Sequence, residues 1–289
     1  MNTLTKHIEK HVEKRIVKFS RIGIYSLLAL TSVMSFSNSW ASEIDSGELD
    51  ANAVIKKSNL ASYYAGDDGS AEARMLIVDA KGNKQMRQFS ILRKDKVDQG
   101  DQDMMVFFSR PTDVKGTVFR VAKKVERDDD RWLYLPALDL VKRISAGDKR
   151  TSFVGSHFFY EDVSGRNPKE DNFSFYRDSS DSNSFFIKGE PKDPNTVEFA
   201  YYQAEIDKTT FLPMLVTYFD QKGNKLRQMS VLKVKNIQDK PTVVHSRIEQ
   251  FSDNSYTEMR FRNVKYDVGL PQSVFSERSL KSPPKAWLN

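Results

Sequence analysis

From Ala71 onward the sequence is a succession of short runs rich in β-branched and aromatic residues, separated by turn residues. Such runs at regular spacing are typical of antiparallel strands that follow one another along a sheet. We therefore expect a meander that closes into a curved sheet or partial barrel. The predicted strands are residues 71–79, 85–93, 103–109, 117–125, 131–136, 139–144, 171–177, 184–189, 196–206, 214–220, 225–235, 242–251 and 255–266.

The sequence also indicates a helical segment before the strands and two similar turns between them. Residues 43–64 lack strong β character, and their apolar spacing suits one or two helical turns packed on the sheet. The segments Asp79–Lys84 and Asp220–Lys225 are nearly identical, and each contains a Gly-Asn pair that favours a tight reversal. We interpret them as the same hairpin used twice in one sheet, in preference to a duplicated half of the chain.

The N-terminal segment has the pattern of an export signal. A basic region ends at Arg21, an apolar stretch covers residues 22–36, and Ser39 and Ala41 are small residues suited to a cleavage site. We expect residues 1–41 to be a cleaved signal peptide, in preference to a membrane anchor, and residues 42–289 to form one domain. Six of the 45 Lys and Arg residues but only two of the 39 Asp and Glu residues lie before residue 42. The remainder is nearly neutral, so a nucleic-acid partner is not expected.

The residue types that catalytic and metal sites need are scarce. The chain has no cysteine, which excludes a disulfide framework, a thiolate metal centre, a cysteine nucleophile and a lipid-modified cysteine. Only His157 and His245 follow the signal segment, and no nucleophile elbow, phosphate loop or dinucleotide motif is present. The adjacent acids Glu161 and Asp162 are expected to be solvated. We therefore expect no enzyme, no metal and no cofactor.

Two strands are apolar at both alternating positions. In Met104–Phe108 and Trp132–Leu135, side chains on both faces of the strand need to be covered. One face suits packing under a helix. The other is either closed core or the lining of a cavity for an apolar ligand, and the pattern alone leaves both interpretations open.

The centre of the chain carries a specific set of motifs. They are Pro111 followed by Lys115-Gly116-Thr117, then Trp132–Ala137, then Lys142-Arg143-Ile144, then Ser152–Asp162. In these motifs, and over nearly all of residues 43–280, the sequence resembles the outer-membrane lipoprotein-sorting protein family, which is similar to LolA, LolB and RseB. One departure is His157, where this family more often carries aspartate.

This resemblance implies a fold and a function. It implies an α+β domain in which a strongly curved antiparallel half-barrel encloses an apolar cavity covered by short helices. It implies a soluble periplasmic carrier of the acyl chains of lipids or lipoproteins, with an inner-membrane exporter of the RND type as a partner. A LolB-like acceptor is held in the membrane by a lipid-modified cysteine, which this chain lacks.

Two other function classes remain open at this stage. One is an RseB-like sensor of envelope stress, which resembles this fold with a further C-terminal domain that we do not expect here. The other is a hydrolase of envelope material, which requires a polar catalytic cluster inside the cavity.

Strand alternation and curvature together suggest which side chains line the cavity. The predicted lipid-binding residues are Met75, Phe89, Val106, Phe108, Phe119, Leu133 and Leu135.

Overall fold

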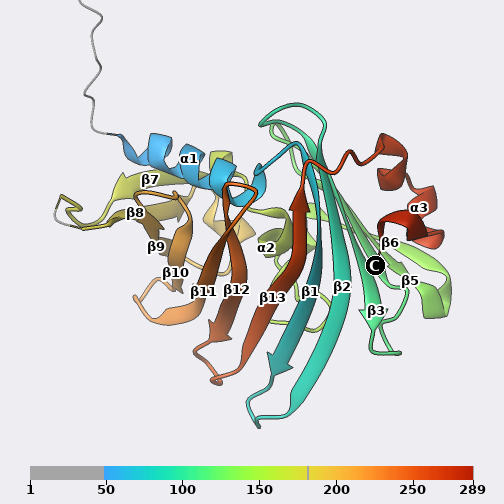
Figure 1. Cartoon of the computed structure of the whole chain (residues 1–289). Helices are drawn as coiled ribbons and strands as arrows, with labels where there is room; N and C mark the ends of the chain where they lie inside the picture. The colour runs from blue at the N-terminus through green and yellow to red at the C-terminus, as the bar shows by residue number, and fades with distance from the viewer. Residues whose placement is uncertain (1–48, 181, 289) are drawn as a thin grey trace, which may run out of the picture. The chain divides into compact units, whose positions relative to one another are not determined.

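The computed structural model describes residues 49–180 and 182–288. The signal peptide predicted for residues 1–41 lies outside these residues. The described part is built on one sheet of thirteen antiparallel strands (Figure 1). The strands are β1 (Asp68–Val78), β2 (Lys84–Asp95), β3 (Gln102–Arg110), β4 (Val118–Lys123), β5 (Asp130–Leu135), β6 (Leu140–Ile144), β7 (Asp171–Phe175), β8 (Ser184–Pro191), β9 (Tyr201–Asp207), β10 (Pro213–Phe219), β11 (Lys225–Ile237), β12 (Lys240–Gln250) and β13 (Tyr256–Tyr266).

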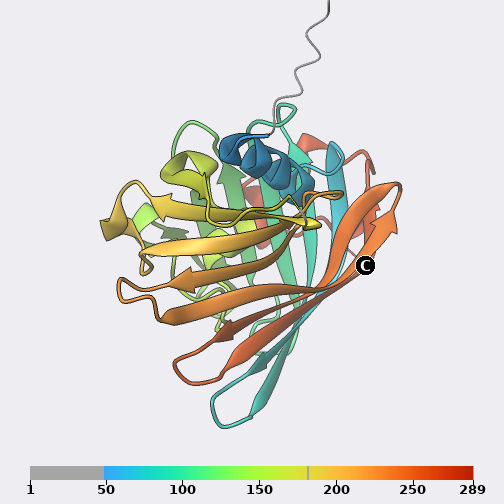
Figure 2. The same cartoon turned by 90° about the vertical axis from the view of Figure 1, so that its left-hand side faces the viewer.

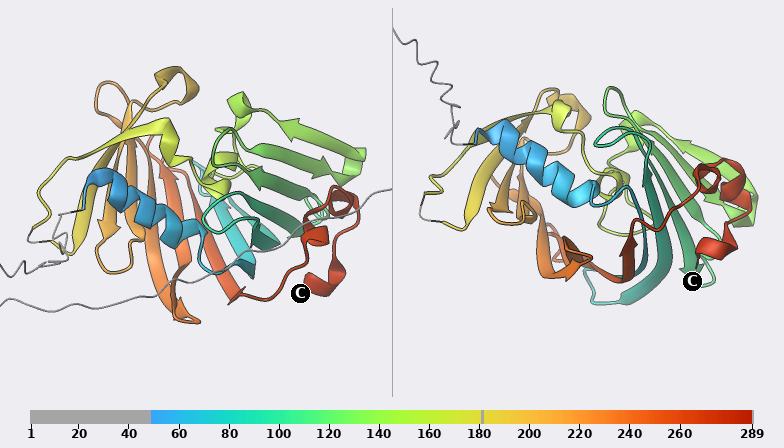
Figure 3. Two further views of the ribbon diagram at one scale, coloured as in Figure 1. Left: turned by 90° about the horizontal axis from the view of Figure 1, so that it is seen from above. Right: turned by 45° about the horizontal axis from the view of Figure 1, so that its top comes forward.

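The strand order is β6-β5-β4-β3-β2-β1-β13-β12-β11-β10-β9-β8-β7. The chain starts at the centre of the sheet and moves outward to β6. It then crosses to β7 at the opposite edge and returns strand by strand until β13 pairs with β1, with Met75 opposite Met259. The sheet is strongly curved (Figure 2), and the crossing segment, residues 145–170, lies on its inner face (Figure 3). This confirms the curved antiparallel sheet expected from the sequence.

Three short helices accompany the sheet: α1 (Ala51–Tyr63), α2 (Tyr160–Ser164) and α3 (Arg278–Lys281). The helix α1 is longer than the one or two turns expected, and the carboxylate of Asp50 caps it by accepting a 2.7 Å hydrogen bond from the Ala53 amide. Single-turn 3₁₀ segments lie at Pro136–Leu138, Ala146–Asp148, Pro168–Glu170, Pro194–Thr196, Gln272–Phe275 and Lys285–Trp287.

Each of the thirteen predicted strands corresponds to one observed strand. The largest difference is at the start of the strand predicted for residues 196–206, because β9 begins only at Tyr201. Pro194 starts a 3₁₀ turn there, and the Asp193 carboxylate accepts a 3.0 Å hydrogen bond from the Asn195 amide. This local hydrogen bonding competes with the strand conformation.

The two similar hairpins fold in the same way. Asp79 accepts hydrogen bonds of 2.9 Å from the amides of Lys81 and Asn83. Asp220 accepts the equivalent bonds, each 2.8 Å, in the second hairpin. The glycine of each turn has a φ of 81°, a left-handed conformation that glycine adopts without strain.

The inner face of β1–β5 forms the largest apolar cluster. Phe153 from the crossing segment lies at its centre, with its ring 5.7 Å from Phe108 and 5.4 Å from Phe119. The outer face of the same strands carries a second cluster, in which Met105 and Phe107 are covered by Leu270, Phe275 and other residues of the C-terminal segment. The two apolar faces of β3 are therefore covered by different parts of the chain.

A third cluster lies under α1. Ala51 and Val54 pack on Ile187 and Ile206, which belong to β8 and β9. The helix α1 is thus fixed on the half of the sheet that contains β7–β10, and its C-terminal end reaches toward the other half (Figure 3).

Candidate functional site

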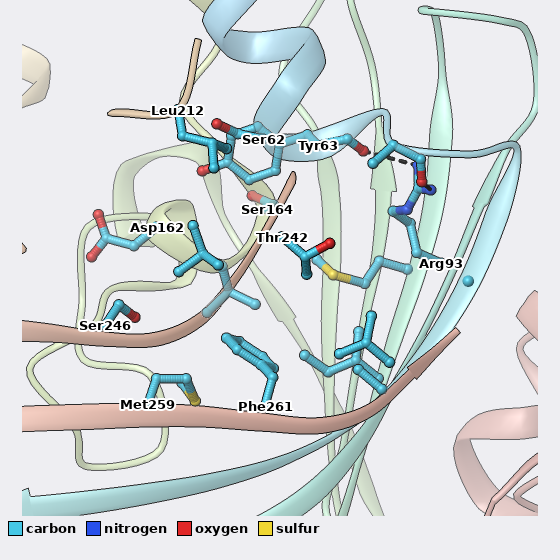
Figure 4. A pocket seen from close by; sticks show the side chains of 18 of the residues that line it. Ser62, Tyr63, Arg93, Asp162, Ser164, Leu212, Thr242, Ser246, Met259 and Phe261 are labelled. Atoms are coloured by element: carbon cyan, nitrogen blue, oxygen red, sulfur yellow. Dashed lines mark hydrogen bonds between the residues drawn. The ribbon is translucent and has the colours of Figure 1, made fainter. Parts of the chain in front are cut away.

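A cavity of about 310 Å³ lies on the inner face of the sheet, between the C-terminal end of α1 and the crossing segment (Figure 4). Its volume is within the range of small-molecule sites. Residues of β1–β3, β10–β13, α1 and α2 form its wall, so the cavity lies where the two halves of the sheet meet. The apolar residues that line it are Ala61, Ala65, Ala71, Phe89, Ile91, Met104, Phe153, Phe158, Val163, Leu212, Pro213, Met229, Val231, Pro241, Val243, Met259, Phe261 and Val264.

Three methionines contribute to this lining, namely Met104, Met229 and Met259. Methionine is unbranched and has three rotatable side-chain bonds, so it adapts its shape to a ligand at low cost. The cavity therefore suits a flexible apolar ligand better than a rigid polar one.

Arg93 lies in the cavity wall, but protein groups already accept hydrogen bonds from both of its Nη atoms. Its Nη1 donates to the carbonyl oxygen of Tyr63 at 2.9 Å and to Asp95 at 2.8 Å. Its Nη2 donates to the carbonyls of Ala65 and Gly66, each at 2.7 Å. The side chain of Gln102 also donates to the Tyr63 carbonyl, at 2.9 Å. These bonds attach the C-terminal end of α1 to β2 and β3.

Asp162, at the other side of the cavity, is also paired. Its carboxylate accepts a hydrogen bond of 2.7 Å from the Phe159 amide and forms an ion pair with Arg227. The Arg227 side chain is almost fully buried and lies over the ring of Phe159, 4.1 Å from its centroid. The charged groups Arg93 and Asp162 are therefore paired with other protein groups, whereas Lys265, the third charged residue of the wall, is exposed.

Glu161 belongs to a buried ion network behind this wall. Its carboxylate lies 2.7 Å from Arg150, 3.1 Å from Lys149 and 3.2 Å from Arg166. Burial raises the pKa of Glu161, but the nearby cations Arg166, Arg150 and Lys149 outweigh burial and lower it to about 2. The expectation that Glu161 and Asp162 are solvated was wrong, because the three cations compensate the burial of Glu161 and Arg227 pairs with Asp162.

Lys123 links α1 to the crossing segment. Its Nζ donates a 3.0 Å hydrogen bond to the carbonyl of Ser164 and lies 4.5 Å from the centroid of the Tyr63 ring. Burial lowers the pKa of Lys123 to about 8. The end of α1 is thus held from two sides, by Arg93 and by Lys123.

The structure brings the seven predicted site residues together in one apolar cluster. Met75, Phe89, Val106, Phe108, Phe119 and Leu133 are buried in it, and Leu135 packs against it. Of the seven, Phe89 lines the cavity. The others lie deeper in the cluster, where Phe153 of the crossing segment fills the inner face of the sheet. Whether they contact a ligand stays a prediction.

Sequence reasoning missed the lining residues of β13, Met259 and Phe261. Their alternation along the strand was a usable signal, but it did not reveal that β13 lies beside β1. The two histidines lie outside the cavity lining. His157 Nδ1 is 2.7 Å from the Thr257 hydroxyl, and His245 Nε2 is 3.0 Å from Glu258.

Within residues 49–180 and 182–288, no helix is long and apolar enough to cross a membrane.

Comparisons with known proteins agree with this description. A family model with the description "Uncharacterized protein" matches residues 100–282. An outer membrane lipoprotein-sorting protein domain from Vibrio parahaemolyticus has a similar structure, with a TM-score of 0.72 and 25% identity over 80% of this chain and 98% of that chain.

Two further solved structures are similar. A DUF1329 family protein from Desulfovibrio piger has a TM-score of 0.70 and 27% identity, over 78% of this chain and 95% of that chain. A LolA superfamily protein from Nitrosomonas europaea has a TM-score of 0.62 and 14% identity, over 80% of this chain and 99% of that chain, and shows the shared fold. No curated protein sequence matches the chain.

Proposed function

We propose that this chain, which belongs to the LolA-like family of outer-membrane lipoprotein-sorting proteins, is a periplasmic carrier that binds acyl chains of lipids or lipoproteins in the cavity between α1 and the sheet. The observation that carries the proposal is the flexible apolar lining, in which the charged residues Arg93 and Asp162 are already paired with other protein groups and Lys265 is exposed.

The energetics fit reversible transport. Each methylene group transferred from water to an apolar site contributes about 0.8 kcal/mol, so even a partly enclosed acyl chain gains several kcal/mol. The chain has no cysteine for covalent attachment of a ligand, and Arg93 and Asp162 in the cavity wall are paired with other protein groups. Binding by shape and apolar contact alone allows the chain to be loaded and released repeatedly.

A carrier needs a donor and an acceptor. The resemblance to companions of inner-membrane exporters supports an RND-type exporter as the membrane partner. In this function the protein acts by binding and release and catalyses no reaction.

The test measures how strongly the protein binds a fluorescent fatty acid and how readily an acyl ligand displaces it. Wild type is compared with two variants, each of which replaces one phenylalanine by glutamate. Phe261→Glu places a carboxylate in the cavity wall and is expected to reduce acyl binding strongly. Phe175→Glu changes an exposed phenylalanine of β7 and is the matched control, with binding unchanged. Circular dichroism verifies that both variants are folded. Equal acyl binding by wild type and folded Phe261→Glu would contradict the proposal.

The natural cargo is identified separately. Protein purified from its own periplasm is extracted with organic solvent, and the extract is examined by mass spectrometry. We expect acyl lipids in amounts comparable to the protein. An extract without acyl lipids, together with no displacement of the fluorescent fatty acid, would overturn the carrier function.

A further inference from the structure

A row of basic side chains crosses the outer face of the sheet, opposite the cavity. In the strand register, Arg74 of β1 lies opposite Arg260 of β13, which lies opposite His245 of β12. His245 in turn lies opposite Lys233 of β11. On the other side, Arg74 pairs with Gln88 of β2, and Gln88 pairs with Arg110 of β3. The row therefore extends over six neighbouring strands, β11-β12-β13-β1-β2-β3, with a basic side chain on five of them and the neutral Gln88 on β2.

Four of these basic side chains are accessible to a partner, whereas the His245 side chain is only 20% exposed. Arg74, Lys233 and Arg110 are exposed, and the Arg260 side chain is 62% exposed. Their exposure follows from strand alternation, because the neighbouring residues Met75 and Met259 point to the inner face and are buried. The C-terminal segment covers Leu92, Met105 and Phe107 on the outer face and leaves the row open.

Acidic groups do not balance this charge. Within the described part of the chain, no carboxylate lies within 4.0 Å of a charged nitrogen of Arg74, Arg110 or Lys233. Glu258 is the acid nearest the centre of the row, and Arg247 at 2.7 Å, Arg260 at 3.0 Å and His245 at 3.0 Å share it.

The pKa of the Glu258 carboxyl reflects this excess of positive charge. Burial raises the pKa of its carboxyl, but hydrogen bonds from Arg247, His245 and Arg260 outweigh burial and lower the pKa to about 2. Like charges directly opposite each other on neighbouring strands destabilise a sheet. Arg74 opposite Arg260 is such a pair, so a role in stability does not explain the row.

We propose that this basic row is a docking surface for an acidic, extended polypeptide segment of a partner protein. The row crosses six strands spaced about 4.8 Å apart, so it is about 24 Å long. An extended segment of about seven residues covers this length. Because the row follows the curved outer face of the sheet (Figure 3), a flexible chain can contact all of it, whereas a flat bilayer touches only part of a convex surface.

The proposal does not rest on acyl binding, because the row and the cavity lie on opposite faces of the sheet. A partner bound to the outer face leaves the cavity free. The same molecule can therefore be held at a docking site while it loads or releases a ligand.

The experiment measures fluorescence anisotropy of a labelled Glu-rich peptide of about ten residues, with a Gln-rich peptide as the probe control. We expect the Glu-rich peptide to bind, with an affinity that falls as ionic strength rises. The double variant Arg74→Glu/Lys233→Glu is expected to weaken binding by about tenfold or more. It also replaces like-charge neighbours by opposite charges, so its melting temperature is expected to stay the same or to rise.

The control variant Lys56→Glu/Lys142→Glu makes the same change in net charge at exposed positions of α1 and β6. It is expected to retain peptide binding. Loss of binding in both double variants would show that only net charge matters, and would overturn a defined docking row. No binding of the Glu-rich peptide by wild type would also overturn it. Binding of phosphatidylglycerol vesicles without binding of the peptide would replace the protein partner by a lipid surface.

Discussion

Nη1 of Arg93 on β2 lies 2.9 Å from the carbonyl oxygen of Tyr63, the last residue of α1. Arg93 also donates to the carbonyls of Ala65 and Gly66, so one side chain holds the end of the helix that borders the cavity. Replacing it by Arg93→Met removes these bonds and is expected to lower the free energy of unfolding by about 1–3 kcal/mol.

Hydrogen exchange monitors the local effect of Arg93→Met. Amides of residues 51–65 are expected to exchange faster, while those of β9 and β10 are expected to exchange as in wild type. Arg93→Lys, which keeps the charge but not the planar arrangement of donors, should give an intermediate result. Unchanged exchange in residues 51–65 would mean that the hydrogen bonds of Arg93 are not needed to hold α1.

Phe108 tests whether the predicted lining residues contact a ligand. Its ring lies 4.9 Å from Phe89 and 5.7 Å from Phe153, and the residue is buried. Phe108→Ala is expected to cost about 3–5 kcal/mol of stability, measured by urea denaturation. Phe108→Arg buries an unpaired charge and is expected to unfold the domain. A folded Phe108→Arg that has lost acyl binding would instead place Phe108 in the ligand site.

The lowered pKa of Lys123 predicts that the free energy of unfolding rises at alkaline pH. Its pKa falls from 10.5 in the unfolded chain to about 8 in the folded protein, because burial disfavours the charged form. Between these two values the unfolded chain binds more protons, so the free energy of unfolding increases as pH rises from 8 toward 10. We expect wild type to gain about 2–3 kcal/mol relative to Lys123→Met over this window. Parallel pH profiles of the two proteins would contradict the lowered pKa.

The lowered pKa of Glu161 predicts that the free energy of unfolding falls in acid. Its pKa falls from 4.5 to about 2 on folding, since Arg166, Arg150 and Lys149 outweigh the effect of burial. The stabilisation is complete above pH 4.5 and is lost as pH falls toward 2, with a total of about 3 kcal/mol. Glu161→Gln leaves three cations around a neutral group. It should be less stable than wild type at pH 7 and should show a smaller dependence on pH between 5 and 2 in thermal denaturation.

Local patterns were sufficient to predict the strands. In β3 the alternation of Met104, Met105, Val106 and Phe107 correctly indicated two covered faces, since period-two burial depends only on neighbours along the chain. The Gly-Asn turns were predictable for the same reason, because their hydrogen bonds lie within the segments 79–84 and 220–225.

The position of the cavity was not predictable in this way. It depends on the pairing of β1 with β13, which places Met259 opposite Met75, and on Phe153 filling the inner face of β1–β5. Both are contacts between segments distant in sequence. The burial of Glu161 was missed because it depends on Lys149, Arg150 and Arg166, whose charges compensate the loss of water only in the folded arrangement.

The junction of β1 and β13 also determines how the chain reaches its native state. The amide of Asp67 donates to the carboxylate of Asp267, 200 residues further along the chain. Because synthesis begins at the N-terminus, β13 is the last strand to be made. The centre of the sheet, where β13 pairs with β1, is therefore the last part that can be completed. Until β13 arrives, β1 presents an open edge that another chain can pair with, and closing so long a loop slows folding. An edge that favours aggregation during folding therefore follows from the same strand order that creates the cavity.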